Sequence, residues 1–500
     1  MKTLVTVEQM RACDRAAIRA GISAEELMMR AARGVFAAYP WQGRVCVVCG
    51  PGNNGGDGYA LALLLREAGI PCRILALSDP STDCAAYYAG LCRDGGIPIE
   101  PADGRPDFSD DADIVDCIYG TGFHGSVTGS VREVVEAINE SGKPVVSVDI
   151  NSGMNGDSGL GEPAVRSTLT VSVGTPKVGH YLGDAKDRIG RLHNVDIGIP
   201  VTDPSCFFVE EDDVRGCFPL RRHNSHKGDY GYVGILGGCA EYAGAAKLAS
   251  LGCAALRSGC GVATVAVPDS IAPAVAPYLL ETTLFRMPDE NGTMIYDPDA
   301  LDRFLSRERS VAVGMGWGSG RDYPEILRRI LEQYEGSLVL DADALNTLAG
   351  MDRALLRKVS GRAILTPHLK EFERISGIPS TQVREDPVRS ARQFAAEYGV
   401  VVLLKGAATV VTDGETTYLC DRGCAGMATA GSGDVLSGIL AGLLGYLPPT
   451  VMTAACGAYI AGLAGEFAER ETNPVSMTAS DTVRAIPAAI SSLFPEKTKK

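Results

Sequence analysis

The sequence predicts an α/β protein of two domains, each built around a mainly parallel sheet. Three observations support this prediction. Short β-branched runs alternate with helical runs in both halves, glycine-rich polar loops follow several apolar runs, and the periodicity is lost between the halves. A chain of 500 residues with 45% hydrophobic content is long enough for about two to four domains with complete cores. The motifs of the two halves differ in order and kind, so no internal repeat is expected.

The composition argues against several classes of protein. A formal net charge of −14 disfavours a nucleic-acid binder, because such a protein needs a basic surface to displace counterions. The 15 cysteines show no regular framework and no signal segment is evident, so we expect a cytoplasmic protein without disulfides. Cys46 and Cys49 form a C-x-x-C, but they lie in an apolar run bounded by Gly43 and Gly50. That setting favours a buried strand over a metal or redox site.

The first 200 residues predict a Rossmann-like three-layer sandwich. Met10–Tyr39 alternates charged and apolar positions at helical spacing, and Gly21 divides it into two predicted helices. Strand-like and helical runs then alternate, which predicts a parallel sheet with helices on both faces. These runs are Val45–Cys49, Tyr59–Ala68, Arg73–Ala76, Asp113–Cys117, Val131–Ile138, Pro144–Ile150 and Leu169–Val173. In such sheets ligands bind beyond the carboxyl ends of the strands.

Three polar loops follow predicted strands in this half: Gly50–Gly58, Asp116–Ser126 and Asp149–Gly153. The first carries Asn53 and Asn54 among glycines, which suits a loop that binds phosphate through backbone N–H groups while amide oxygens face a cation. Two carboxylates and an asparagine from separate strand ends fit a monovalent cation, or Mg²⁺ with waters, better than zinc or calcium. The alternative is three exposed turns whose acids cap the following helices.

These motifs, NNGGDG, D-x-x-x-GTGFHG and VDINSG, resemble the NAD(P)H-hydrate epimerase domain over about residues 5–205. The resemblance implies that Asn54, Asp116 and Ser152 hold K⁺. It also implies that Asp149 binds the substrate and acts as the acid/base near the hydrated nicotinamide ring. The remaining substrate-binding residues that it implies are Asn53, Asn54, Gly55, Gly56, Asp57, Gly120, Thr121, Gly122, Phe123, His124, Gly125 and Ser126.

A domain boundary is predicted near residue 215, giving domains 1–215 and 216–500. The periodicity fades after Pro200, an acidic run follows over Val209–Asp213, and the chain then becomes basic at Arg221–His223. We interpret the acidic run as a solvated linker rather than a binding surface.

The second half predicts another mainly parallel sheet, with polar segments after its strands. Asp341 and Asp343 either serve Mg²⁺ through waters or cap a helix, and His368 either contacts substrate or is structural. Lys405–Thr409 offers a cation and a close backbone to a nucleotide, and Gly314–Gly318 is a glycine turn beside a ligand or a simple tight turn. The predicted strands are Tyr232–Leu236, Val262–Val267, Ser310–Val313, Ser337–Leu340, Ala363–Leu365 and Val400–Leu404, with a helix over Ala243–Ser258.

The segment Gly426–Asp434 predicts a phosphate site, because it is a glycine-rich loop that opens the apolar helix Val435–Leu444. Asp434 in the first turn would repel a phosphate. Its place there is explained if it removes a proton from a hydroxyl that attacks the phosphoryl group. The alternative is an ordinary acid at a helix N-terminus. Residues 435–465 carry no charge, but Pro448–Pro449 divides them into two pieces, each expected to be too short for a bilayer, so we expect two buried helices.

The string GMATAGSGDVLSGILAGLL resembles the NAD(P)H-hydrate dehydratase branch of the ribokinase-like superfamily, and the likeness extends over about residues 220–495. It implies a ribokinase-like three-layer sandwich in which Gly316, His368 and Asp434 contact the hydrated dinucleotide. The nucleotide would be held by Lys405, Gly406, Ala407, Ala408, Thr409 and Gly433. Two departures stand out. Leu369-Lys370 replaces the usual Pro-Gly before Glu371, which puts the shape of that loop in doubt, and Met315 and Trp317 are expected to narrow the pocket.

Together the two resemblances imply a bifunctional NAD(P)H-hydrate repair enzyme. One domain would interconvert R- and S-NAD(P)HX, and the other would dehydrate the S form with ADP or ATP as phosphoryl donor. The expected cofactors are K⁺ in the first domain and Mg²⁺ in the second, and the partners are NADHX, NADPHX and ADP/ATP, with no nucleic acid or membrane. Self-association into a homo-oligomer is expected from the apolar helices. The alternatives are a sugar or vitamin kinase with a regulatory N-terminal domain, and an N-terminal domain that binds dinucleotide without catalysis.

Overall fold

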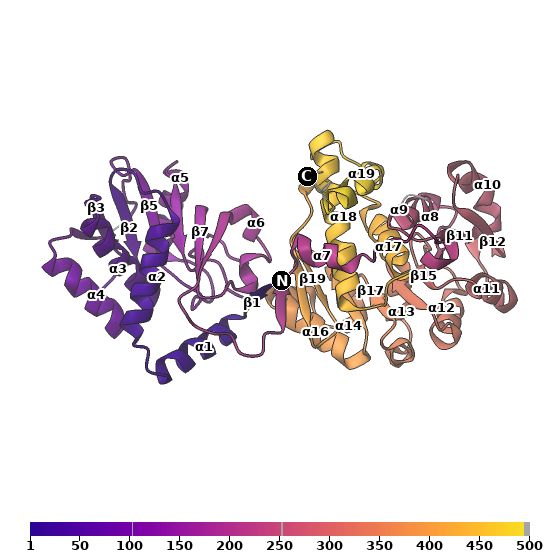
Figure 1. Ribbon diagram of the computed structural model, residues 1–500, viewed down its shortest axis with the longest axis horizontal. Coiled ribbons are helices and arrows are strands. Elements are labelled where there is room, and N and C mark those ends of the chain that lie inside the picture. Colours follow the sequence, from indigo (N-terminus) through magenta and orange to yellow (C-terminus); the bar gives the residue numbers. More distant parts are fainter. Residues whose placement is uncertain (103, 252–253, 495–500) are drawn as a thin grey trace. The chain divides into compact units, whose positions relative to one another are not determined.

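The computed structural model describes residues 1–102, 104–251 and 254–494, which form two compact units (Figure 1). The first unit is Thr3–Pro204, and the second starts at Ser205 and also takes in Met1–Lys2. The chain divides near residue 205 rather than near 215. The predicted solvated linker is wrong, because its residues begin the helix α7 (Glu211–Cys217), whose Val214 is fully buried in the core of the second unit. Val209 just before α7 is buried in the same core.

The first unit contains a parallel sheet in the order β4-β3-β2-β5-β6-β7-β8. The order reverses direction between β2 and β5, and such a switch point is where parallel sheets bind ligands. The strands are β2 (Val45–Cys49), β3 (Cys72–Ala76), β4 (Ile99–Pro101), β5 (Asp113–Cys117), β6 (Val145–Val148), β7 (Ser167–Val173) and β8 (Ile189–Val195); a short strand β1 (Lys2–Leu4) lies at the start of the chain.

Helices cover both faces of this sheet, which confirms the predicted three-layer sandwich. Along β2, Val45, Val47 and Cys49 pack with α2, α3 and α4, while Cys46 and Val48 pack on the opposite face with α5, as expected from the two-residue period of a strand. The C-x-x-C pair is therefore part of a buried strand. The helices are α1 (Val7–Arg19), α2 (Ala24–Ala38), α3 (Asn53–Glu67), α4 (Asp83–Asp94), α5 (Gly129–Glu140) and α6 (Ala185–Arg188).

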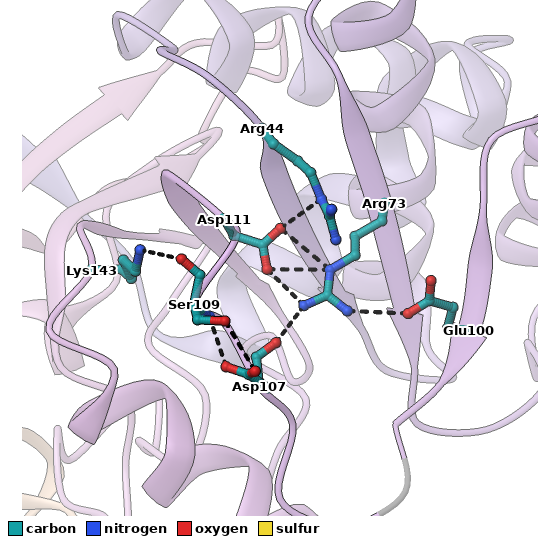
Figure 2. A network of polar contacts seen from close by, with 7 residues as sticks. All are labelled: Arg44, Arg73, Glu100, Asp107, Ser109, Asp111 and Lys143. Carbon is teal, nitrogen blue, oxygen red and sulfur yellow. Dashed lines mark hydrogen bonds and ion pairs between the residues drawn. The ribbon is translucent and has the colours of Figure 1, made fainter.

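A network of ion pairs lies at the amino-end side of this sheet, around Asp111 and Arg73 (Figure 2). Asp111, just before β5, is fully buried and pairs with Arg44 Nε at 3.1 Å and with Arg73 Nη2 at 2.6 Å. Arg73 also pairs with Glu100 on β4 at 3.1 Å and donates to the carbonyl of Asp107. These contacts join the starts of β2, β3 and β5 to β4, so we assign the network a structural role.

The second unit contains a larger sheet that runs β9-β20-β19-β18-β17-β16-β15-β10-β11-β12. Its pairs are parallel except for β18–β19 and β19–β20. The strands are β9 (Cys206–Phe208), β10 (Tyr232–Leu236), β11 (Val262–Pro268), β12 (Thr283–Met287), β15 (Ser310–Val313), β16 (Ser337–Leu340), β17 (Ala363–Leu365), β18 (Val401–Leu404), β19 (Thr409–Thr412) and β20 (Thr417–Cys420), with a separate hairpin β13 (Asp289–Glu290) and β14 (Thr293–Met294).

Helices again form layers on both faces (Figure 1). One layer contains α8 (Ala243–Ser250), α9 (Ala254–Arg257), α17 (Ser432–Leu444), α18 (Val451–Glu471) and α19 (Ala479–Ser492). The other contains α11 (Pro298–Leu305), α12 (Tyr323–Gln333), α13 (Asp343–Ala349), α14 (Leu369–Ser376) and α16 (Pro387–Tyr398); the shorter α10 (Ala272–Val275) and α15 (Ser380–Glu385) complete the unit. The helix predicted over Ala243–Ser258 is interrupted after Ser250, and residues 252–253 lie outside the described residues.

The uncharged segment forms two buried helices, as predicted, but one is longer than expected. The helix α18 has 21 residues and is long and apolar enough by length and composition to cross a membrane. However, 83% of the most apolar 18-residue stretch of this helix is buried inside the protein, as is typical of a core helix. The helix α18 is longer than predicted because it continues through charged residues after residue 465, where the uncharged segment ends.

Candidate active sites

A cavity of about 710 Å³ lies at the switch point of the first sheet. Its walls come from α1, from the loops after β2 and β5, and from the segments after β6 and β7. The predicted site residues that line it are Asn53, Asn54, Asp57, Gly120, Thr121, Gly122, Phe123, His124 and Asp149. The structure therefore brings the three predicted loops together. Gly55, Gly56, Gly125 and Ser126 were also predicted but are not among the lining residues.

The segment Asn53–Asp57 forms the start of α3 rather than a loop. The predicted helix start near Tyr59 is wrong: α3 begins at Asn53, because two of the glycines serve close packing within the helix and not a flexible loop. A Cβ at Gly55 would collide with the carbonyl of Gly50, and one at Gly56 would lie 2.6 Å from Met28 Sδ. The unpaired N–H groups of the first turn open onto the cavity, which favours an anionic group there.

The predicted cation ligands lie around the buried end of β5. Asp116 is fully buried and accepts hydrogen bonds from Ser147 Oγ at 2.8 Å and from the Ser152 N–H at 2.9 Å. Ser152 Oγ also donates to Asp116, and burial raises the pKa of this carboxyl although the hydrogen bonds oppose the shift. Both polar atoms of the buried Asn54 side chain lack a hydrogen-bond partner among the described residues. Unpaired and carboxylate oxygens of this kind fit a hard cation such as K⁺.

Asp149 lies directly after β6 in a strained backbone conformation, with φ of 68°. Its Oδ1 is 2.5 Å from Lys177 Nζ, its Oδ2 accepts from the Thr121 N–H at 3.2 Å, and its carbonyl oxygen is 2.7 Å from His180 Nε2. Burial alone would raise the pKa of Asp149, but the Lys177 ammonium, His180 and the Thr121 N–H together hold it below its usual value. These contacts keep the Asp149 carboxylate ionised and fix its position.

Several residues of this site were not identified from the sequence. Lys177 is 1% exposed and lines the cavity beside Asp149. Asp14 and Arg11 reach the same cavity from α1. A lysine shortly after a predicted strand was a signal for Lys177, because it follows β7 as Asp149 follows β6. Nothing in the local sequence placed α1 against the switch point.

In the second unit, Asp434 lies in the first turn of α17, as predicted, with Gly431 at the N-cap in a left-handed conformation (φ 93°). Burial raises the pKa of Asp434 to about 7, and the Asp341 and Asp343 carboxylates add to the shift while Lys405 opposes it. A carboxyl group that titrates near neutral pH is suited to act as a general base. A Cβ at Gly433 would lie 3.5 Å from Lys405 Nζ and 3.6 Å from Asp341 Oδ2, so this glycine borders the same charges.

Those charges form a compact cluster. Asp341, 2% exposed, is 2.9 Å from Lys405 Nζ through Oδ1 and accepts from Ser437 Oγ at 2.7 Å through Oδ2. Lys405 Nζ is also 3.8 Å from Glu371 Oε2. Burial alone would lower the pKa of Lys405, but the Asp341 and Glu371 carboxylates raise it overall, so the ammonium stays charged. Ser437, one turn after Asp434 on α17, was not identified from the sequence.

Asp343 lies beside the cluster, one residue after the N-cap Ala342, and among the described residues α13 has no side-chain capping hydrogen bond. Asp343 begins α13 and accepts from the Gly318 N–H at 2.7 Å and from Asn346 Nδ2 at 3.1 Å, so it ties the glycine turn after β15 to α13. The residue between the two acids, Ala342, has φ of 48°, which is strained for a residue with a Cβ.

His368 is the N-cap of α14. Its Nδ1 accepts from the N–H groups of Lys370 at 3.1 Å and Glu371 at 3.3 Å, while Glu371 Oε2 accepts from the His368 N–H at 2.8 Å. This reciprocal capping fixes the loop despite the Leu369-Lys370 departure. The His368 side chain is still 51% exposed, so the structural and substrate-contact readings are compatible.

The other predicted residues of this unit lie on separate segments. Gly316 (φ 63°) lies against Tyr242 and Ala245 at the start of α8, where a side chain would collide. Residues 405–408 form the turn from β18 to β19, and Thr409 is the first residue of β19. Met315 and Trp317 are fully buried, and Trp317 stacks on Tyr323 with ring centroids 4.7 Å apart. Both side chains pack into the core, so the expectation that they narrow a pocket is wrong.

Comparison with known proteins assigns both units to families. A family model described as YjeF-related protein N-terminus matches residues 24–179, and one described as NAD(P)H-hydrate dehydratase matches residues 233–488. The bifunctional NAD(P)H-hydrate repair enzyme Nnr of Moorella thermoacetica is 35% identical over 475 residues, covering 91% of this chain and 88% of that protein. The enzyme of the same name from Pyrobaculum aerophilum is 33% identical and covers 98% of both chains.

The chain belongs to this family. The predictions of a bifunctional NAD(P)H-hydrate repair enzyme, with an epimerase and a dehydratase domain, are thereby confirmed. Among solved structures, a ribokinase-like superfamily protein from Enterococcus faecalis aligns with a TM-score of 0.51 and 23% identity, covering 58% of this chain and 96% of that one. That likeness concerns the fold alone, and it confirms the ribokinase-like fold predicted for the second unit.

Proposed function

We propose that each of the two activities of this family, epimerisation and dehydration of hydrated NAD(P)H, is carried out by one of the two sites described above. The cavity of the first unit interconverts the R and S epimers of NADHX and NADPHX. The cluster around Asp434 in the second unit removes water from the S epimer, with ADP or ATP as phosphoryl donor. Phosphate is released, together with AMP when ADP is the donor.

The observation that carries the dehydratase assignment is Asp434 in the first turn of α17, beside the Lys405–Asp341 pair. Its pKa of about 7 allows it to take the proton of the C6 hydroxyl at neutral pH. The N–H groups at the start of α17 and the Lys405 ammonium provide positive charge for a transferring phosphoryl group. Loss of phosphate from C6 then restores the nicotinamide ring.

Mg²⁺ and K⁺ are part of this proposal. Asp341 and Glu371 offer the hard carboxylate oxygens that Mg²⁺ reaches directly or through water, and a bound Mg²⁺ would neutralise phosphate charge. In the first unit, Asn54, Asp116 and Ser152 would hold K⁺ beside the N-terminus of α3, where the cation would supply counter-charge for the dinucleotide phosphates.

One experiment tests both activities. The protein is incubated with both NADHX epimers, Mg²⁺ and K⁺, with either ADP or ATP, and absorbance is followed at the reduced-nicotinamide band. We expect full recovery of NADH with one phosphate released per dinucleotide, and the more effective nucleotide identifies the donor. A stable phosphorylated product would support a small-molecule kinase instead. Conversion that stops when the S epimer is consumed would indicate an N-terminal unit that binds dinucleotide without catalysis.

A further inference from the structure

Asp14 reaches the epimerase cavity from a different element than Asp149, the predicted catalytic residue of this domain. It lies on α1, whose Met10, Cys13 and Ala17 are buried at helical spacing against Leu27 and Ala31 of α2. The N-terminus of α1 is fixed by its Thr6–Gln9 capping box. With that face packed, Asp14 lines the cavity together with Asp57, Asp149 and Lys177.

The Asp14 and Asp149 carboxyl groups have contrasting surroundings. Asp149 is engaged on both oxygens, by Lys177 Nζ and by the Thr121 N–H, and is held in its ionised form. No described residue donates a hydrogen bond or forms an ion pair with the Asp14 carboxyl. Burial and the Asp149 charge raise the pKa of Asp14, although Lys177 and Arg15 oppose the shift. Two carboxyl groups whose environments separate their pKa values are the usual arrangement for an acid and a base in one site.

We infer that Asp14 is a second catalytic residue of the epimerase site, acting as the general acid that complements Asp149 as the base. This inference rests on the proposed epimerase function of the cavity. Nothing in the sequence motifs or in the family comparisons assigns this role to Asp14.

The chemistry balances with these two groups and water. The Asp14 proton passes to the C6 hydroxyl oxygen, and the C6–O bond breaks with its electron pair leaving on water. The ring nitrogen lone pair forms the C6=N bond. A second water then adds to the opposite face of C6, its proton passes to the Asp149 carboxylate, and the epimer is complete. The reverse reaction uses the two carboxyl groups in exchanged roles.

Asp57 is the competing candidate for the acid, because it lines the same cavity and burial raises its pKa well above the usual value. It lies, however, on α3 just after the first turn, whose unpaired N–H groups favour the dinucleotide phosphates. Asp14 lies on α1 instead, and the charges of Asp149 and Lys177 act on Asp14 as they also do on Asp57. The other charged groups near Asp14 are Asp57 itself and, on α1, Arg11 and Arg15.

The test uses Asp14→Asn, Asp14→Glu and Asp57→Asn in the full-length chain. Exchange between purified NADHX epimers is followed by chromatography across a pH range, with the spontaneous rate subtracted. For Asp14→Asn we expect kcat to fall by at least about 10², with KM changed by less than a fewfold. The decline of wild-type kcat at high pH, where the acid is lost, should disappear in this variant. Asp14→Glu should restore both the rate, in part, and the decline, whereas Asp57→Asn should keep the decline.

The outcomes of this experiment either support or overturn the assignment of Asp14 as the general acid. A rate of Asp14→Asn within a fewfold of wild type, a rise in KM alone, or loss of the decline in Asp57→Asn instead would overturn the assignment. If Asp14→Asn fails to fold, as judged by its thermal transition, Asp14→Glu carries the test: a folded Asp14→Glu variant that exchanges the epimers no faster than the spontaneous rate, or that lacks the decline at high pH, would then contradict the acid role. If the wild-type protein shows no exchange above the spontaneous rate, the proposed epimerase function itself fails, which is a different result from an active wild type with an active Asp14→Asn.

Discussion

Asp434→Asn separates the function of this carboxyl group from its effect on stability. In the folded protein its pKa is raised from 3.8 to about 7, chiefly by burial. Each pKa unit corresponds to about 1.4 kcal/mol, so a shift of about three units corresponds to about 4 kcal/mol. Because the folded pKa lies above the unfolded value, ionised Asp434 destabilises the fold. This penalty is absent below about pH 4, grows as the pH rises, and is complete above about pH 7.

Asparagine keeps the shape of the side chain but cannot ionise, so the variant avoids this penalty. We expect Asp434→Asn to be more stable than the wild type at pH 8 in the absence of nucleotide, by up to about 4 kcal/mol, since the raised pKa already includes the attraction to Lys405. The difference should be less than half as large at pH 5. Dehydration of pure S-NADHX should nevertheless fall by at least about 10². Nucleotide affinity should hold or rise, because a negative charge beside the phosphates is gone.

The measurements are thermal unfolding at pH 5 and pH 8 and steady-state dehydration. Asp299→Asn is the matched control, since Asp299 is an exposed acid in the first turn of α11. It should be slightly destabilising at both pH values, by about 0.3–1 kcal/mol, through the helix dipole. If Asp434→Asn behaves like this control and turns over within a fewfold of wild type, Asp434 is an ordinary helix-end acid and the mechanism is refuted.

Three further predictions concern the first unit. Asp149→Ala should let a mixture of epimers react only until the S fraction is consumed, as followed by absorbance; fast and complete conversion would remove Asp149 from the mechanism. Asp116→Ala should weaken K⁺ and dinucleotide binding together in calorimetric titrations, and weakening of one without the other would argue against a shared site. Asp111→Asn should destabilise this unit by about 3–5 kcal/mol, because Arg73 would be left without its buried partner, while dehydration of pure S-NADHX stays normal. An unchanged thermal transition would show that the network contributes little.

The sequence by itself determined the elements whose signal is local. The strands β2, β5, β10, β15, β16 and β17 occur as predicted because each is a short apolar run bounded by turn residues or polar loops. The carboxyl ends of parallel strands meet at one edge of a sheet, so the sequence also predicted that Asn53, Asp149 and the residues 120–124 would share a site. Asp434 in the first turn of α17 followed from the glycine loop before it.

Only the tertiary structure decided which groups pair and what each glycine does. The pairing of Lys177 with Asp149, of Lys405 with Asp341, and the approach of Asp14 from α1 join residues distant along the chain. The spacing of apolar residues in the sequence indicates which face of a helix or strand is buried. It carries no information about which side chain of another element packs against that face. The acidic run that begins α7 and the NNGGDG segment that begins α3 differ from their predicted loop structure for the same reason. Their local composition resembles a loop, and packing against distant residues such as Met28 or the core around Val214 makes them helical.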